Sequence, residues 1–178
     1  ALSGASAAAL VSMVASLTIG KKGYEDSEVT MKEVYEQANI YKEKFIGYID
    51  ADSESFHGVM DAFKLPKNND EEKAIRKETI QNALKHASET PYKIAENAYR
   101  LMDYSEKAVE HGNKNAVTDA AVSAMMARSA VLSALCNVKI NLSSINDSEF
   151  VATFEKKVSL LETNVVEREK RILSKVVI

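Results

Sequence analysis

The amino-acid sequence predicts an all-α protein, an elongated bundle of about five helices forming a single domain over residues 1–178. Apolar residues recur every three or four positions over long stretches, which is the period of an amphipathic helix, and no stretch alternates as a strand would. Gly and Pro number only six and two, so few turns interrupt these stretches. Hydrophobic residues make up 46% of the chain, which is enough to build a core.

The first predicted helix covers residues 1–19, ends before Gly20 and carries no charge. Its alanines are interspersed with serines and a threonine, so it is too small and hydroxylic for a comfortable membrane span. We therefore expect a helix packed on all sides inside protein, and no membrane association. The sequence begins at Ala1 rather than Met, and we expect the true N-terminus to lie further upstream.

The second helix is predicted from Ser27 to Leu65, because Pro66 cannot continue it. Its apolar positions form one stripe: Met31, Val34, Ala38, Tyr41, Phe45, Tyr48, Phe56, Val59 and Phe63. The third helix is predicted from Asn69 or Asp70, where acidic residues suit the first turn, to His111, with a kink or break at Pro91.

The fourth predicted helix spans about Asn115 to Leu142 and is apolar nearly all round, which is typical of an interior helix. The fifth begins at Asp147, a good N-cap, and runs to the end of the chain. Its apolar face comprises Phe150, Phe154, Val158, Leu161, Val165 and Ile172.

The second helix is about 58 Å long at 1.5 Å per residue. A compact globule of this chain length has a diameter of about 40 Å, so long helices would leave apolar stripes in water. Either the fold is an elongated bundle or a second copy covers the overhang. We favour a homodimer, the commonest closed assembly.

Charge and cysteine content exclude several classes of protein. The net charge is −3 and basic residues are spread along the chain, which argues against binding nucleic acid or anionic membranes. A single cysteine, Cys136, rules out an internal disulfide and fits a reducing cytoplasm; its apolar neighbours predict a buried thiol. His57, His86 and His111 show no metal-ligand spacing, so no metal site is predicted.

Asp52 interrupts the apolar stripe of the second helix, four residues from both Tyr48 and Phe56. A carboxylate on a buried stripe must be paired, hydrogen-bonded or protonated, and such groups are candidate acids or bases. The structural alternative is an aspartate that caps another helix or bridges to a lysine. Lys64 follows three turns later, where a solvated lysine at a helix end is the commoner case.

The fourth helix is polar at both ends of one face. Asn115 and Asp119 lie one turn apart, and Asn137 and Asn141 lie at the other end, about 27 Å away. The two ends cannot serve one reaction centre in the same subunit. A hydrogen-bonded packing seam is an equal alternative to a site. The preceding loop, residues 111–115, offers backbone N–H groups and Lys114 to an anionic ligand group.

Four stretches resemble the formimino-tetrahydrofolate cyclodeaminase and methenyl-tetrahydrofolate cyclohydrolase family. They are ALSGASAAALVSMVASLTIGKKGYED at 1–26, DADSESFHGVMDAFKLP at 50–66, GNKNAVTDA at 112–120 and NVKINLSSI at 137–145. The resemblance covers essentially the whole chain and implies a multihelical fold, an intertwined dimer and a folate substrate without a metal or cofactor. The family's Pro-Gly-Gly-Gly stretch before the first helix is absent here.

The resemblance implies one of two reactions. Cyclodeamination of 5-formimino-tetrahydrofolate to the 5,10-methenyl form, with release of ammonia, is the first expectation. The alternative is hydrolysis of the methenyl form to 10-formyl-tetrahydrofolate. Both pass through a tetrahedral carbon and need a proton acceptor and a proton donor. A non-catalytic helical dimer scaffold is the third interpretation, in which the carboxylates only fix the register.

For either of the two reactions, we expect Asp52 and Asp119 to transfer protons or to stabilise the cationic carbon. We expect Lys64 to position or tune a carboxylate. Asn115 and Asn113 bind the substrate. We expect Lys21, Lys22 and Lys114 to meet the glutamate carboxylates of the folate.

Overall fold

A computed structural model describes residues 1–177, and within them five α-helices and no strand are present. The helices are α1 (Leu2–Ser16), α2 (Glu28–Lys64), α3 (Asp70–His111), α4 (Val117–Leu142) and α5 (Ser148–Leu173). Short 3₁₀ turns, Glu25–Ser27 and Lys114–Ala116, lead into α2 and α4. The predicted all-α fold and the order of its helices are confirmed.

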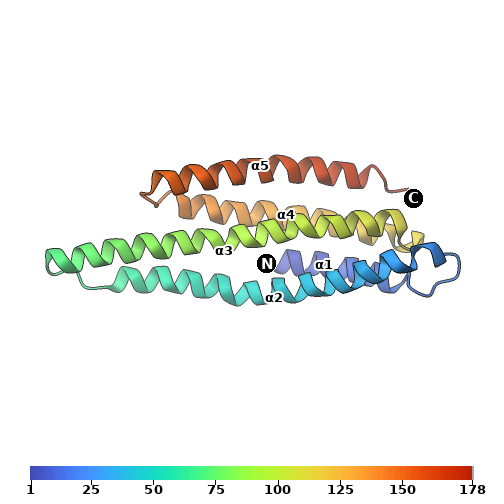
Figure 1. The fold of residues 1–178 in the computed structure, drawn as a ribbon, viewed down its shortest axis with the longest axis horizontal. Helices are drawn as coiled ribbons and strands as arrows, with labels where there is room; N and C mark the ends of the chain where they lie inside the picture. The colour runs from blue at the N-terminus through green and yellow to red at the C-terminus, as the bar shows by residue number, and fades with distance from the viewer. Residues whose placement is uncertain (178) are drawn as a thin grey trace.

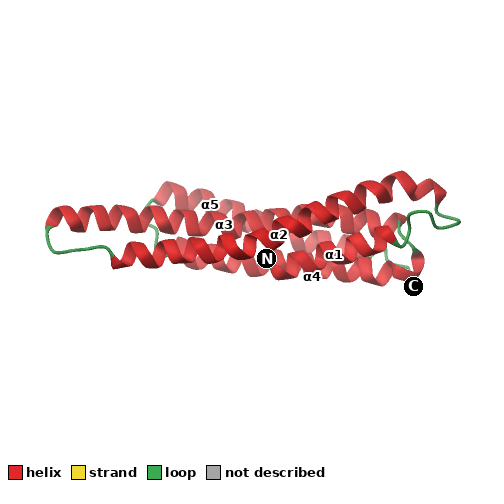
Figure 2. Ribbon diagram, turned by 90° about the horizontal axis from the view of Figure 1, so that it is seen from below, coloured by secondary structure: helices red, strands yellow, loops and turns green. Residues whose placement is uncertain are grey.

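The bundle is elongated because its two longest helices, α2 and α3, contain 37 and 42 residues, about 56 and 63 Å. Both views show a long, narrow molecule in which the hairpin of α2 and α3 projects beyond the other helices (Figures 1 and 2). Each helix packs on the next along the chain, α1 also packs on α4, and α5 also packs on α3. Helix α1 starts near the middle of the bundle and runs beside only the first half of α2 (Figure 1).

The predicted helix boundaries are set by local capping. Asn69 Oδ1 accepts a hydrogen bond from the backbone N–H of Glu72 at 2.8 Å, and Asp147 Oδ1 accepts one from Phe150 N at 3.0 Å. Both bonds satisfy amide donors that the first turn of a helix leaves free. At the C-terminal end of α2, Leu65 has an extended backbone, as expected for the residue before a proline.

Helix α3 continues through Pro91 without the predicted break. The proline ring has no N–H, so the carbonyl of Ala87, four residues earlier, lacks its usual backbone donor. The side-chain Nδ2 of Asn141, on α4, donates to this carbonyl at 2.7 Å. Neighbouring helices can therefore supply the hydrogen bond that the proline removes.

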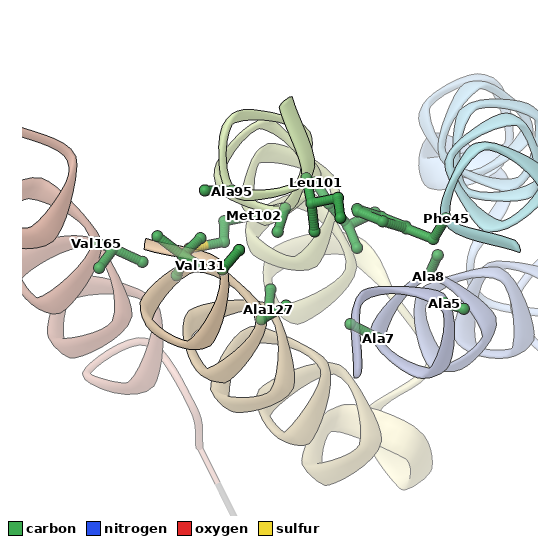
Figure 3. Close-up of a cluster of buried hydrophobic side chains, with 14 of the residues drawn as sticks. Ala5, Ala7, Ala8, Phe45, Ala95, Leu101, Met102, Ala127, Val131 and Val165 are labelled. Carbon is green, nitrogen blue, oxygen red and sulfur yellow. The ribbon is translucent and has the colours of Figure 1, made fainter. Parts of the chain in front are cut away.

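The core runs along the centre of the bundle, where α1, α2, α3 and α4 meet (Figure 3). Three alanines of α1, Ala7, Ala8 and Ala15, are fully buried and allow its backbone to approach its neighbours closely. The opposite face of α1 is not covered, since Leu2 is 72% and Met13 is 40% exposed. The expectation that this helix is packed on all sides is therefore wrong for the single chain.

The predicted stripe of α2 is buried only in part. Met31, Val34, Ala38 and Phe45 are fully buried, whereas Phe56 is 61% and Phe63 is 48% exposed. The second half of α2 extends past the start of α1, so its buried face is mainly the one against α3 and includes Ser55 and Ala62. The remaining surface, which we call the exposed α2 stripe, comprises Ile46, Ile49, Ser53, Phe56, Met60 and Phe63. The expectation that long helices leave apolar surface uncovered is confirmed.

Helix α4 corrects one further expectation. Cys136 is exposed rather than buried, because an apolar sequence does not reveal which side of a helix faces its neighbours. Within residues 1–177, the segment long and apolar enough to cross a membrane is Lys114–Leu142, not the first helix. Half of its most apolar window is buried inside the bundle.

Candidate functional site

Asp52 lies in a groove of about 610 Å³ between α2 and α4, with α3 forming part of the wall. The groove is lined on one side by Asp52, Phe56 and His57, and on the other by Asn137, Ile140 and Asn141. Asp52 is half-buried, so its carboxylate keeps access to solvent and to a ligand in the groove.

A second cavity of about 380 Å³ adjoins the first. Ala1, Leu2 and Ser3, at the start of α1, contribute to its wall. Asp52 and Asn137 line both cavities and therefore stand between them. The start of α1 carries the positive end of the helix dipole, which favours an anionic group in the cavity beside it.

Neither structural role proposed for Asp52 from sequence is found within residues 1–177. Its carboxylate accepts no hydrogen bond from a described residue, so it caps no helix there. No lysine of that part of the chain lies within salt-bridge distance of it. The contact it does make is through its backbone carbonyl, which accepts a hydrogen bond from Ser55 Oγ at 2.8 Å. A half-buried carboxylate in a groove without a protein partner is suited to binding a cationic ligand group or transferring a proton.

The loops at the opposite end of the bundle bring together several residues predicted to bind substrate. Lys21 Nζ donates to Asn113 Oδ1 at 2.6 Å, and Asn115 N donates to the same oxygen at 3.1 Å. The backbone N–H of Lys114 donates to the Tyr24 hydroxyl at 2.9 Å. These contacts join the loop after α1 to the loop before α4, and we call them the loop cluster.

The loop cluster leaves some of its predicted binding groups available and uses others internally. Asn113 is buried and Lys21 is half-buried, so both also hold the two loops together. Lys22, Lys114 and Asn115 are exposed and can meet a ligand. Asp119 lies half-buried in the first turn of α4, one turn after Asn115.

Within one chain the two groups of residues remain apart. Asn137, beside Asp52, is 18 residues from Asp119 along α4, which corresponds to about 27 Å. Lys64 is 12 residues from Asp52 along α2, or about 18 Å, and its amino group pairs with Asp61 at 2.7 Å on the exposed surface. The single chain therefore does not bring Asp119 or Lys64 to Asp52.

Three residues of the groove were not selected from sequence. Asn137 and Asn141 were noted as polar positions on an apolar helix, and that contrast was the signal that could have identified them. His57 was considered as a metal ligand, yet it lines the same groove as Asp52. Among residues 1–177 no three His, Cys, Asp or Glu side chains gather closely enough to hold a metal ion.

Comparisons with known proteins agree with this architecture. The family model described as formiminotransferase-cyclodeaminase matches residues 1–160. A methenyltetrahydrofolate cyclohydrolase of Methylorubrum extorquens is 43% identical over 150 residues, which is 84% of this chain and 72% of that protein. A formimidoyltransferase-cyclodeaminase of Gallus gallus is 33% identical over 164 residues, but this chain spans only 30% of its length.

A solved structure is also similar over nearly the whole chain. The crystal structure of formiminotetrahydrofolate cyclodeaminase from Thermotoga maritima superposes with a TM-score of 0.86 at 31% identity. The match covers 98% of this chain and 83% of that one.

Proposed function

The chain belongs to the formiminotransferase-cyclodeaminase family and is a folate one-carbon enzyme, and from this premise we propose that it is a methenyl-tetrahydrofolate cyclohydrolase. The observation that favours this reaction is the 43% identity to a cyclohydrolase of which the chain covers 72%. The sequence motifs do not separate this reaction from cyclodeamination, which was the first expectation, because both reactions pass through a tetrahedral carbon between two nitrogens. Cyclodeamination remains the second candidate, because the superposed structure is a cyclodeaminase.

The proposed reaction begins when water adds to the cationic methenyl carbon that bridges N5 and N10. Asp52 accepts the proton that the water loses, so a neutral carbinolamine forms without a free hydroxide. The bond from this carbon to N5 then breaks, and Asp52 returns its proton to N5. The hydroxyl proton passes to solvent or to a second base as the formyl carbonyl forms on N10. One water is consumed and one proton is released in total.

The groove supports this role for Asp52 in two ways. Its carboxylate makes no hydrogen bond or salt bridge with a described residue and lines a cavity large enough for a heterocyclic ligand. A carboxylate close to the bridging carbon also stabilises the positive charge of the methenyl substrate. The scaffold interpretation requires Asp52 to hold the fold together, and no contact of its side chain supports that requirement.

We propose that a homodimer completes the site. The exposed α2 stripe borders the groove and repeats at intervals of three and four residues, the spacing used where helices of two chains pack together. A second copy placed against it could bring its own Asp119, Asn115 and exposed lysines to Asp52. Lys64 could likewise act on a site of the partner. The lysines would then meet the glutamate carboxylates of the folate.

The partners and location complete the proposal. A folate is the expected ligand, without a metal or cofactor, and neither nucleic acid nor a membrane is an expected partner. A cytoplasmic location is the expectation that the single cysteine supports.

Two substrate incubations test the proposed reaction. With 5,10-methenyl-tetrahydrofolate, the cyclohydrolase is expected to speed the loss of the methenyl absorbance beyond the rate in buffer. With 5-formimino-tetrahydrofolate, a cyclodeaminase would instead raise this absorbance and release ammonia. Activity with the second substrate alone would overturn the cyclohydrolase proposal, and activity with neither would favour the scaffold.

A further inference from the structure

A backbone carbonyl of α3, that of Ala87, holds the side chain of Asn141 in place. Pro91 leaves the Ala87 carbonyl without a backbone donor, and Asn141 Nδ2 supplies the missing hydrogen bond at 2.7 Å. A carbonyl can only accept, so the NH₂ end of the amide must face it. The orientation of the Asn141 amide is therefore determined by the proline on the neighbouring helix.

This orientation leaves the amide oxygen of Asn141 available. Oδ1 accepts no hydrogen bond from any described residue, although Asn141 is half-buried and lines the groove that contains Asp52. Among the described residues Oδ1 is not one of the fully buried atoms without a partner, so solvent reaches it and a ligand donor can take the place of water. The groove thus holds a fixed neutral acceptor, Asn141 Oδ1, and the carboxylate of Asp52.

The shape and chemistry of the groove define what could satisfy this acceptor. Phe56 from α2 and Ile140 from α4 are 61% and 67% exposed and contribute apolar surface to the same groove. A flat heterocycle that carries N–H groups on its edge would use both the apolar walls and the acceptor. The pteridine ring of a folate has this combination, with a ring amide N–H and an exocyclic amino group.

We propose that Asn141 is a specificity-determining residue, whose Oδ1 accepts a hydrogen bond from an N–H group of the pteridine ring. Pro91 acts as the positioning residue, because it frees the carbonyl that holds the amide in place. This proposal rests on the proposed function, since it assumes a folate in the groove. It assigns the pteridine to the end of the groove beside Asn141, with the reacting carbon towards Asp52.

The structural and binding roles of Asn141 can be separated by first removing the proline. In P91A the backbone N–H of residue 91 can bond to the Ala87 carbonyl, so Asn141 is no longer needed to satisfy it. The P91A and P91A/N141A proteins are therefore expected to unfold at similar temperatures. In the original background N141A is expected to lower the unfolding temperature, because the Ala87 carbonyl is left unpaired.

Binding of tetrahydrofolate, which lacks the reactive carbon, is then measured by calorimetry on these proteins. P91A/N141A is expected to bind about 10-fold more weakly than P91A, the loss of one hydrogen bond of ordinary strength. P91A/N141D keeps an acceptor and is expected to bind within about 3-fold of P91A. Turnover should follow with a raised KM and a kcat that changes less.

The outcomes distinguish the two proposals. Equal binding by P91A and P91A/N141A would overturn the role of Asn141 while leaving the proposed function intact. Failure of the unmodified protein to bind tetrahydrofolate would instead count against the proposed function itself.

Discussion

The backbone of Gly4 lies against the ring of Phe45: a Cβ atom added at position 4 would be 2.8 Å from the Cδ1 and Cε1 atoms of that ring. Phe45 is fully buried and cannot move aside without disturbing the core. This contact sets how closely the start of α1 approaches α2. It therefore shapes the cavity that Ala1 to Ser3 and Asp52 line together.

We predict that G4A destabilises the protein by about 1–3 kcal/mol, the usual cost of overpacking a core. Unfolding by urea measures this change. Gly47 provides the control, since a Cβ there would meet nothing within 4 Å. G47A should stabilise α2 by about 0.5–1 kcal/mol, because alanine favours a helix interior. Equal stability of the G4A and unmodified proteins would show that α1 can shift without penalty.

Replacing Asp52 with asparagine tests its role in the reaction. D52N should lower kcat about 10²–10⁴-fold if Asp52 transfers protons. Its unfolding temperature should be unchanged or higher, because the carboxylate makes no hydrogen bond or salt bridge within the described residues. D50N, two residues earlier on the same helix and exposed, should keep full activity. Full activity of D52N would remove Asp52 from the mechanism.

Glu106 should make stability depend on pH. Burial acts to raise its pKa, but hydrogen bonds from Arg171 and Lys175 and their positive charges outweigh burial and lower it. A carboxylate whose pKa is lower in the folded state stabilises the fold above its unfolded pKa. That stabilisation is lost as the pH falls through the folded pKa.

The E106Q variant should therefore unfold more easily than the parent at pH 7, by about 2 kcal/mol. The difference should shrink as the pH falls below the unfolded pKa of a glutamate and through the lower folded pKa, because the parent glutamate then becomes neutral too. Urea unfolding at several pH values measures this. E167Q, which changes an exposed glutamate on α5 without a described ion pair, should show little difference at any pH. A gap that stays constant with pH would contradict the assignment.

The exposed α2 stripe should hold two copies together. We expect sedimentation to show a dimer, and I46E should shift it towards the monomer by placing a charge in the interface. Activity should fall with dissociation if residues of both subunits form the site. L160E, on the exposed face of α5, is the matched control and should remain dimeric. A fully active monomer would overturn the proposal that subunits share the site.

Much of the fold could be predicted because its determinants are local. Capping by Asn69 and Asp147, and the stop before Pro66, fix helix ends to within a residue or two. The exposure of Phe56 and Phe63 could not be predicted in this way. It depends on α1 being too short to cover the second half of α2, which is a property of the packed bundle. The exposed position of Cys136 could not be predicted for a different reason. The apolar residues of α4 show too weak a periodicity to indicate which side of the helix faces its neighbours.

The candidate site shows a similar division. Asp52 could be selected because a carboxylate interrupts an apolar stripe. Its neighbours Asn137 and Asn141 lie more than 80 residues away in sequence, and only the register between α2 and α4 places them opposite it. The hydrogen bond from Asn141 to the Ala87 carbonyl likewise depends on the alignment of α3 with α4. Local patterns in sequence do not encode such alignments.

The packing of α1 on α4 has a consequence for the order of folding. Ser3 Oγ donates to the carbonyl of Met126 at 2.8 Å, joining positions 123 residues apart. Consecutive helices can pair as hairpins after closing short loops, whereas this pairing closes the largest loop in the bundle and has the greatest entropic cost. We therefore expect α1 to dock on α4 last. The cavity beside Asp52 would be assembled in that final step, and would be the first to open when the protein begins to unfold.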